Sequence, residues 1–161
     1  MGGIGLVIVI GAILISMAAA MYMYTQYQTN FIQVAAGEPV IVGPVEYIIT
    51  FDGTHQGNEE TTPENTFVKI RIVAKNTSQE TTKMSGGQFY LIDEKEQKHE
   101  AVFGGFSQED LFNVNLEPEK PESWTTQFDV PYDEQKQYNI VIRPSKQQST
   151  VDTAMICLTK C

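Results

Sequence analysis

No charged side chain occurs before Glu38 in this 161-residue chain. All 11 basic and all 20 acidic residues follow, so the net charge of −9 belongs entirely to residues 38–161. A secretory signal peptide carries basic residues ahead of its apolar region, and this N-terminus has none. The acidic balance of the remainder argues against a nucleic-acid partner, whose phosphates it would repel, and against docking on anionic lipid headgroups.

Histidine is scarce and catalytic motifs are absent from the sequence. His55 and His99 are the only histidines, and neither has a carboxylate or cysteine at a spacing that makes a known motif. One loop groups four carboxylates at a spacing unlike that of an EF-hand: Asp52, Glu59, Glu60 and Glu64. It is read as a solvated acidic loop. We therefore expect no enzymatic activity, no cofactor and no metal site.

Cysteine is limited to Cys157 and Cys161, close to the C-terminus. Two cysteines are too few ligands for a metal site. They are either two free thiols or a small disulfide loop, and the second alternative requires a bent chain, because a regular strand would hold their Cα atoms too far apart. A disulfide would place this end of the chain in an oxidising compartment.

The long uncharged stretch at the N-terminus is apolar almost throughout from Ile4 to Tyr24. As an α-helix it would be about 30 Å long, which matches the hydrocarbon core of one bilayer. Tyr22, Tyr24 and Tyr27 gather at its C-terminal end, where an interfacial aromatic belt would lie. The stretch is too long for the apolar region of a cleaved signal, so we expect a membrane span or the packing core of a polymer.

Small residues along this stretch leave shallow places where a second helix can approach closely. A monomeric anchor has no need of them, whereas a helix that packs against copies of itself does. The expected helix-packing positions are Gly3, Ile4, Gly5, Gly11 and Ala18.

The segment GGIGLVIVIGAILISMAAA resembles the N-terminus of mature archaellins and archaeal type IV pilins, which open on a Gly-Ile-Gly-type sequence followed at once by an apolar helix. The resemblance places Gly3, Ile4 and Gly5 on that opening and implies a polymerising helix. It covers about the first 25 residues. Gly5 stands where bacterial type IV pilins usually have glutamate, which favours the archaeal branch.

The start of the chain leaves two alternatives open. If Met1 is the first residue after a peptidase has removed a basic leader, the chain is a filament subunit. If Met1 is the initiator and nothing is cleaved, the chain resembles the stator proteins of the archaellum, which have an uncleaved anchor and a β-sandwich outside.

Strand patterns dominate the rest of the chain, with no amphipathic helix after residue 37. Alternating or continuous apolar runs predict strands at 45–51, 67–76, 88–93, 98–103, 123–130, 138–144 and 153–158. The run FIQVAAGEPVIVGP is broken by glycine and proline and is predicted to be a hinge. Residues 107–112 are predicted to form a helical turn with Ser107 as its cap and Asp110 behind it.

The expected fold class is α+β: a long N-terminal hydrophobic helix in residues 1–36, followed in residues 37–161 by an antiparallel immunoglobulin-like β-sandwich of about seven strands. The body also resembles the small immunoglobulin-like domains carried on membrane anchors in archaea and Gram-positive bacteria. An Asn76-Thr77-Ser78 sequon makes Asn76 a possible N-glycosylation site and, with the cysteines, favours an exterior location.

These features predict a structural subunit of an extracellular, archaeal type IV pilus-like filament, either an archaellum or an adhesive pilus. Its partners would be copies of itself, the membrane before assembly, and the filament's assembly platform. The alternative is a membrane-anchored extracytoplasmic β-sandwich protein, such as an archaellum stator component or a surface-binding module.

Overall fold

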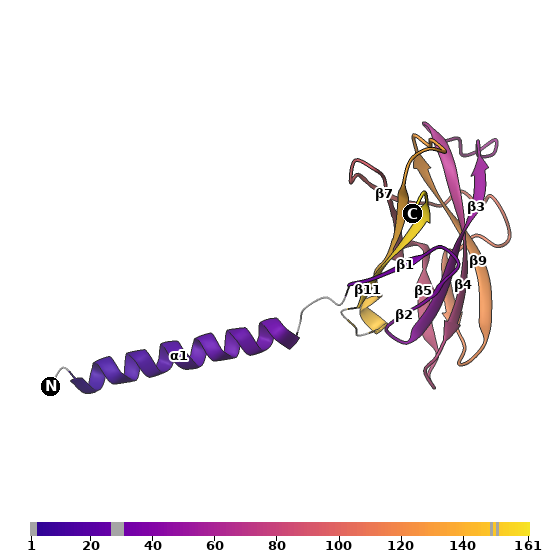
Figure 1. Ribbon diagram of the computed structural model, residues 1–161. Coiled ribbons are helices and arrows are strands. Elements are labelled where there is room, and N and C mark those ends of the chain that lie inside the picture. The colour runs from indigo at the N-terminus through magenta and orange to yellow at the C-terminus, as the bar shows by residue number, and fades with distance from the viewer. Residues whose placement is uncertain (1–2, 27–30, 149, 151) are drawn as a thin grey trace.

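The computed structural model describes residues 3–26, 31–148, 150 and 152–161. Gly3–Gln26 form a single α-helix of 24 residues, α1. It stands apart from the strands of the body (Figure 1). The helix forms because no proline interrupts it and alanine, leucine and methionine, which are good helix formers, recur along it. Within it, Val7–Thr25 is apolar and long enough to cross a membrane, and none of this segment is buried by the rest of the chain.

The described residues contain eleven strands. Nine form one sheet in the order β1-β11-β10-β6-β7-β9-β4-β3-β2, and β5 and β8 form a separate antiparallel pair. The strands are β1 (Phe31–Ala35), β2 (Pro39–Val42), β3 (Val45–His55), β4 (Thr66–Asn76), β5 (Thr82–Ser85), β6 (Phe89–Ile92), β7 (Lys98–Val102), β8 (Asn113–Leu116), β9 (Pro121–Val130), β10 (Tyr138–Ile142) and β11 (Thr153–Thr159). Two short 3-10 helices are η1 (Gly86–Gln88) and η2 (Lys146–Gln148).

The nine-stranded sheet bends at β7 to make two facing layers. The first part of β7 pairs with β6, where Glu100 lies opposite Tyr90, and its end pairs with β9, where Ala101 lies opposite Phe128. We call β1, β11, β10 and β6 the β10 layer, and β9, β4, β3 and β2 the β4 layer. Both layers are visible in Figure 1. The result is the predicted fold class, one N-terminal helix followed by an antiparallel-rich β-sandwich.

All seven predicted strands are present, as β3, β4, β6, β7, β9, β10 and β11. The sequence did not predict β1, β2, β5 or β8, which have only four or five residues each. The predicted helical turn at 107–112 is present only as a single turn over residues 107–110, where the Asp110 N–H donates to the Ser107 carbonyl at 3.4 Å and the Ser107 hydroxyl accepts from the Glu109 N–H at 3.2 Å. Asp110 closes this turn, because the backbone N–H groups of Phe106 and Ser107 and the Ser107 hydroxyl all donate to its carboxylate, at 2.6, 3.2 and 2.9 Å.

The predicted division between residues 1–36 and 37–161 is also wrong. The helix ends at Gln26, and β1 belongs to the sandwich, where it pairs in parallel with β11. The predicted hinge is a strand, a turn and a second strand. Gly37 has a φ of +85°, which favours glycine, and it turns the chain between β1 and β2. Tyr27 and Met1 lie outside the described residues.

The core lies between the two layers and is built from the inward side of each alternating strand. Tyr47 of β3 and Phe89 of β6 meet across it in an edge-to-face contact, with ring centroids 5.8 Å apart. The core side chains include Val45, Tyr47, Ile49, Val68, Ile70, Ile72, Phe89, Leu91, Phe128, Ile140, Ile142 and Ile156. These side chains come from strands that are distant in sequence, and together they form one continuous hydrophobic core.

Ile72 and Val73 are neighbours on β4 that point to opposite faces, so they provide a matched test of this core. Ile72 is fully buried and Val73 is only half-buried. We expect Ile72→Ala to lower the free energy of unfolding by about 3 kcal/mol through lost burial and a residual cavity. Val73→Ala should cost less than about 1 kcal/mol. Urea denaturation followed by tryptophan fluorescence measures both, and equal losses would contradict the assignment of faces.

Candidate functional site

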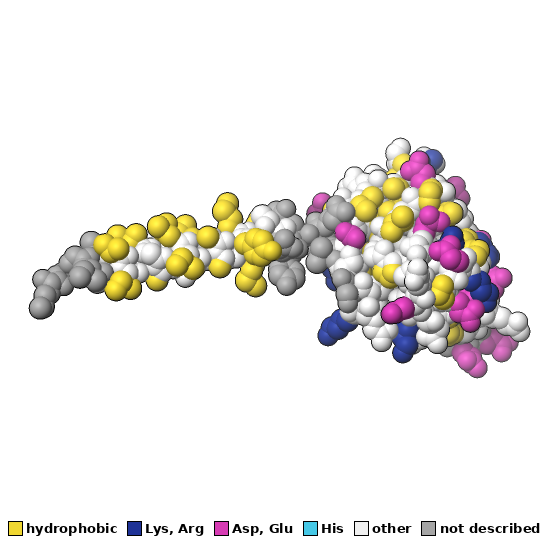
Figure 2. Space-filling view, turned by 90° about the horizontal axis from the view of Figure 1, so that it is seen from below, with side chains coloured by type: hydrophobic (Ala, Val, Ile, Leu, Met, Phe, Trp, Pro, Cys, Tyr) yellow, Lys and Arg dark blue, Asp and Glu magenta, His cyan; other side chains and the backbone are white. Residues whose placement is uncertain are grey.

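The residues expected to mediate helix packing all lie in α1. Gly3, Ile4, Gly5, Gly11 and Ala18 are helical, and a Cβ atom added at Gly5 or Gly11 would meet nothing within 4 Å. The described large apolar side chains of α1 are between 49% and 73% exposed. Hydrophobic atoms cover the helix in Figure 2, whereas basic and acidic side chains are confined to the body. The helix thus presents an apolar surface that nothing in the described chain covers.

The two cysteines are joined by a disulfide in the structure. Their Cα atoms lie 5.7 Å apart. The chain bends back after β11, with Lys160 in the left-handed region at a φ of 52°. This bend is what the short separation of Cys157 and Cys161 requires.

Asn76 is not a glycosylation site in this fold. The residue is completely buried, and its Nδ2 atom, where a glycan would be attached, donates hydrogen bonds to the backbone oxygens of Glu80 (2.7 Å) and Leu116 (3.0 Å). Its Oδ1 accepts from the backbone and hydroxyl of Ser78. The sequon residues therefore form a turn locked by the asparagine side chain.

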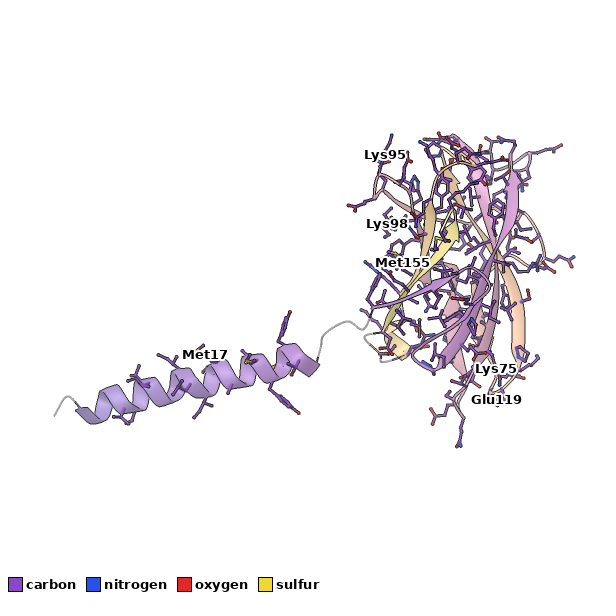
Figure 3. The ribbon with its side chains drawn as sticks, viewed as in Figure 1. Met17, Lys75, Lys95, Lys98, Glu119 and Met155 are labelled. Atoms are coloured by element: carbon purple, nitrogen blue, oxygen red, sulfur yellow. A yellow bond between two sulfur atoms is a disulfide. The ribbon has the colours of Figure 1, made fainter. Side chains whose placement is uncertain are left out.

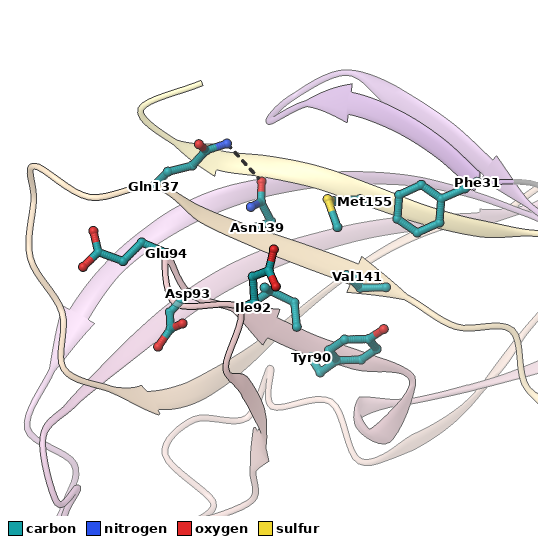
Figure 4. A pocket seen from close by; sticks show the side chains of 10 residues that line it. Phe31, Tyr90, Ile92, Asp93, Glu94, Gln137, Asn139, Val141 and Met155 are labelled. Carbon is teal, nitrogen blue, oxygen red and sulfur yellow. Dashed lines mark hydrogen bonds between the residues drawn. The ribbon is translucent and has the colours of Figure 1, made fainter.

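An apolar groove lies on the outer face of the β10 layer, away from the core. Its volume is about 520 Å³. It crosses four strands, and we call it the β10 groove. It is lined by Phe31, Tyr90, Ile92, Asp93, Glu94, Glu96, Gln137, Asn139, Val141 and Met155. Figure 4 shows it with Phe31 at one end and Glu94 at the other.

The floor of the β10 groove is formed by outward-facing apolar residues of neighbouring strands. Val141 lies opposite Tyr90 of β6 and opposite Met155 of β11. Although it faces away from the core, it is only 2% exposed. Phe31, at the start of β1, is 48% exposed. The outer face of an antiparallel sandwich is normally polar, so this apolar strip is unusual.

The acidic end of the groove is the turn between β6 and β7. The Asp93 carboxylate accepts hydrogen bonds from the backbone of Lys95 and Gln97, both at 2.9 Å, and contacts His99 Nε2 at 3.1 Å. Burial by itself raises the pKa of Asp93, but the hydrogen bonds from His99 and the two backbone groups outweigh it and lower the pKa below its usual value. Asp93 is therefore ionised and serves to hold the turn.

Two further carboxylates of this turn line the groove, and they differ in whether another side chain already binds them. Glu94 forms an ion pair with Lys136 at 2.5 Å. Glu96 has a φ of 61°, and among the described residues its carboxylate makes neither an ion pair nor a hydrogen bond. At the side of the groove, Gln137 Nε2 lies 3.5 Å from both Cys157 Sγ and Asn139 Oδ1. Gln137 Oε1 and Asn139 Nδ2 have no hydrogen-bond partner among the described residues, so they remain able to bond elsewhere.

Four cations lie beside the groove and none of them lines it: Lys136, which pairs with Glu94, Lys95 in the same turn, Lys98 and Arg143. Lys98 Nζ and Arg143 Cζ lie over the ring of Tyr90, 4.9 and 5.0 Å from its centroid, and both line a separate hollow of about 130 Å³. In Figure 3, Met155, Lys98 and Lys95 lie along one side of the body, far from the Lys75–Glu119 ion pair. The groove lining therefore combines apolar and acidic groups only with uncharged polar ones.

A second hollow, of about 340 Å³, lies by the loop that follows β3. It includes Asp52, but this carboxylate forms ion pairs with Lys69 and Arg71 at 3.4 and 3.2 Å. The carboxylates Glu59, Glu60 and Glu64 do not line it. Within the described residues there is no group of three or more His, Cys, Asp or Glu side chains that could hold a metal ion.

The β10 groove was missed at the level of sequence, although a signal for it exists. The run FYLI in β6 is apolar at every position, and YNIVI in β10 has only one polar residue. Alternate positions of these runs fill the core, so Tyr90, Ile92 and Val141 must face outward. Strands that are apolar on both faces, in an otherwise alternating sandwich, indicate a covered or binding face.

Comparison with known proteins gives a family for the body and a fold for most of the chain. A family model described as "Domain of unknown function (DUF4352)" matches residues 34–151. Among curated protein sequences, none matches the chain significantly. The family match leaves α1 outside it, so the archaeal pilin resemblance of residues 3–20 rests on the helix alone.

Several solved structures share the fold. The yjhA protein of Bacillus subtilis is 17% identical, with a TM-score of 0.61 over 80% of this chain and 98% of its own. A putative lipoprotein, ycdA, from the same organism is 13% identical, with a TM-score of 0.57 over 78% of this chain and 39% of its own. The secreted protein MPT63 of Mycobacterium tuberculosis is 6% identical, with a TM-score of 0.58 over 83% and 100%. None of these descriptions names an enzyme, and at these identities the likeness shows the fold alone.

His55, beside the second hollow, makes the stability of the body dependent on pH. Its ring packs between Phe67 and Phe106, with centroids 5.2 and 5.0 Å away. Its Nδ1 accepts a hydrogen bond from the backbone N–H of Gly57 at 3.1 Å, so the neutral ring fits. Burial first, and the charge of Lys69 second, lower the pKa of His55 below 6.5, against a smaller opposing effect of Asp110.

We expect the free energy of unfolding to fall as the pH decreases from about 7.5 to about 5.5, because the unfolded chain then binds a proton that the folded His55 resists. The contribution of His55 to the free energy of unfolding is fully present above the pKa that this residue has in the unfolded chain, and it declines below that pKa. His55→Asn, which keeps an acceptor but does not titrate, should flatten the fall. Urea midpoints across this range measure the slope, and an unchanged slope in His55→Asn would contradict this role.

Proposed function

We propose that this chain, which belongs to the DUF4352 family, is a membrane-anchored module that displays a binding β-sandwich outside the cytoplasmic membrane. The observation that carries the proposal is the combination of an uncharged α1, whose apolar segment Val7–Thr25 is not buried by the rest of the chain, with a separate body that has an apolar groove. The helix supplies attachment and the groove supplies recognition. No catalytic constellation among the described residues competes with this assignment.

The exposed surface of α1 supports anchoring because it cannot remain in water. Its large apolar side chains are about half to three-quarters exposed. Apolar surface costs roughly 25 cal/mol per Å², so a helix of this length exposes surface worth on the order of tens of kcal/mol. Charged residues are absent from α1, so the hydrocarbon core of a bilayer accepts it without a desolvation penalty for charge.

The exterior location of the body is supported by its chemistry and by its structural neighbours. The Cys157–Cys161 disulfide is of the kind that persists in oxidising compartments. Among proteins of similar fold, one is described as a putative lipoprotein and another as a secreted protein. A net charge of −9 also keeps the body off anionic headgroups, which leaves its groove free.

A second candidate function is a subunit of a pilus-like filament. It is favoured by α1, which is apolar on all sides and has open space at Gly5 and Gly11, as well as by the resemblance of residues 3–20 to archaeal pilins. In a filament, the helices of many copies would cover one another's apolar surface and the sandwiches would form the outside. Both candidates place α1 out of water and differ in what surrounds it.

Removing α1 tests the anchoring proposal. We expect the full chain to fractionate with membranes and to resist extraction at alkaline pH, whereas residues 31–161, which contain the whole core, should be soluble and folded. Protease added outside intact cells should digest the body of the full chain. A body that is protected until the membrane is permeabilised would contradict the exterior location.

A buried charge in α1 tests both candidates. We expect Gly11→Glu to reduce membrane insertion, because a carboxylate at the centre of a span costs about 2.5–3.5 kcal/mol, while Gly11→Ala should insert normally since its Cβ meets nothing. Negative-stain microscopy of sheared surface material separates the candidates. Filaments whose mass spectrum matches the wild-type chain, and which Gly11→Glu abolishes, would establish the filament and overturn the single-anchor reading.

A further inference from the structure

We propose that the β10 groove binds an extended polypeptide segment of another protein, in which apolar side chains are followed by one or more lysine or arginine residues. This inference rests on the proposed function, because it names the partner class of the displayed module. It is carried by three properties of the groove: an aliphatic floor, free amides beside it, and a carboxylate rim at one end.

The floor selects the body of the ligand. Met155 and Val141 lie between the rings of Phe31 and Tyr90, and Ile92 extends this apolar floor along β6. Burying hydroxyl groups against such a surface without hydrogen bonds is costly, so a sugar fits it poorly. Alternate apolar side chains of an extended peptide fit it well, because they all lie on one face of the strand. Each buried chain removes apolar surface from water on both partners.

The amides at the side of the groove suit a polypeptide backbone. Gln137 Nε2 contacts Cys157 Sγ and Asn139 Oδ1, whereas Gln137 Oε1 and Asn139 Nδ2 have no partner among the described residues. This acceptor and this donor are the groups that a peptide N–H and C=O require. An extended segment above the floor would therefore have partners for backbone groups that lose contact with water.

The carboxylate rim selects the charge of the ligand. Asp93 and Glu94 are already engaged by His99 and Lys136, whereas among the described residues Glu96 has no partner. Two further cations, Lys98 and Arg143, are held over Tyr90 outside the groove, and Lys95 of the turn does not line it. A lysine or arginine of the ligand can lay its aliphatic stem on the floor and place its charge at Glu96. The charge of −9 on the body disfavours an acidic partner.

The full chain in nanodiscs of zwitterionic phosphatidylcholine is the test material. The probe is a fluorescent nonapeptide that alternates serine with valine or leucine and ends in two lysines, with matched peptides that end in two glutamines or two glutamates. We expect saturable binding of the lysine peptide by fluorescence anisotropy, weaker binding of the glutamine peptide and none of the glutamate peptide. Raising the salt concentration from about 50 to about 500 mM should weaken the binding of the lysine peptide.

Paired variants locate the binding. Met155→Lys puts a charge on the floor of the groove. It should lower the affinity for the lysine peptide by at least about tenfold, since it removes apolar contact and adds repulsion. Ile41→Lys adds the same charge to the exposed face of β2, where Ile41 is 52% exposed, and should bind like wild type. Glu96→Gln should weaken binding about threefold, the size expected of an exposed charge pair. Glu59→Gln, on the remote loop, should have no effect.

Three results would overturn the inference. Equal binding by Met155→Lys and Ile41→Lys would place the peptide elsewhere, and equal binding of all three peptides would show that the rim does not select charge. Saturable binding of a chito-oligosaccharide that Met155→Lys abolishes, without peptide binding, would make the groove a glycan site. Thermal melts confirm that each variant is folded. These measurements use purified protein, so a body found inside the cell would contradict the proposed function without affecting them.

Discussion

A two-layer sandwich can bury only one face of each layer, and the other properties of this body follow from that constraint. The inward positions of the strands are filled by one continuous core, which leaves two outer faces to be reconciled with water. On the β4 layer this is done with charge: Lys69 and Arg71 project outward and form ion pairs with Asp52, and Arg71 also reaches Glu109. On the β10 layer the outward-facing positions hold Tyr90, Val141 and Met155 instead. This outer face therefore keeps an apolar strip.

Buried glutamines of the two 3-10 helices, η1 and η2, form a hydrogen-bonded network against the core. Gln148 of η2 is buried, accepts a hydrogen bond from Gln88 at 3.0 Å and points its amide nitrogen toward the Tyr47 hydroxyl at 3.5 Å. Burial, only partly offset by this contact with Gln148, raises the pKa of Tyr47 to about 12, so the phenol stays neutral in the core. Satisfied networks of this kind fix a unique arrangement where apolar packing alone would allow several.

The periodic part of this architecture was predictable from sequence, and the rest was not, for identifiable reasons. Strict alternation of apolar and polar residues, as in FVKIRIVAKN of β4, predicts both that the segment is a strand and which of its faces is buried. The sequence predicts a hinge in place of β1 and β2 because two prolines and two glycines lie in this run, and local residue preference does not report the pairing of β1 with β11 or of β2 with β3. The sequon at Asn76 was misleading because a three-residue motif does not report burial. The groove could not be predicted without the order of the strands in the sheet, since it brings together residues as distant in sequence as Phe31 and Met155.

The position of the groove relative to the helix limits what can reach it. Five peptide steps separate Gln26 from Phe31, so covalent geometry holds the two within about 18 Å. Phe31 lines one end of the groove and Glu96, in the β6–β7 turn, lines the other. In the proposed anchored state the apolar end of the groove therefore lies close to the C-terminal end of the membrane helix. A narrow extended segment needs less room beside that attachment than a bulky globular domain. The attachment of the helix next to the groove thus favours the same class of ligand as the chemistry of the lining.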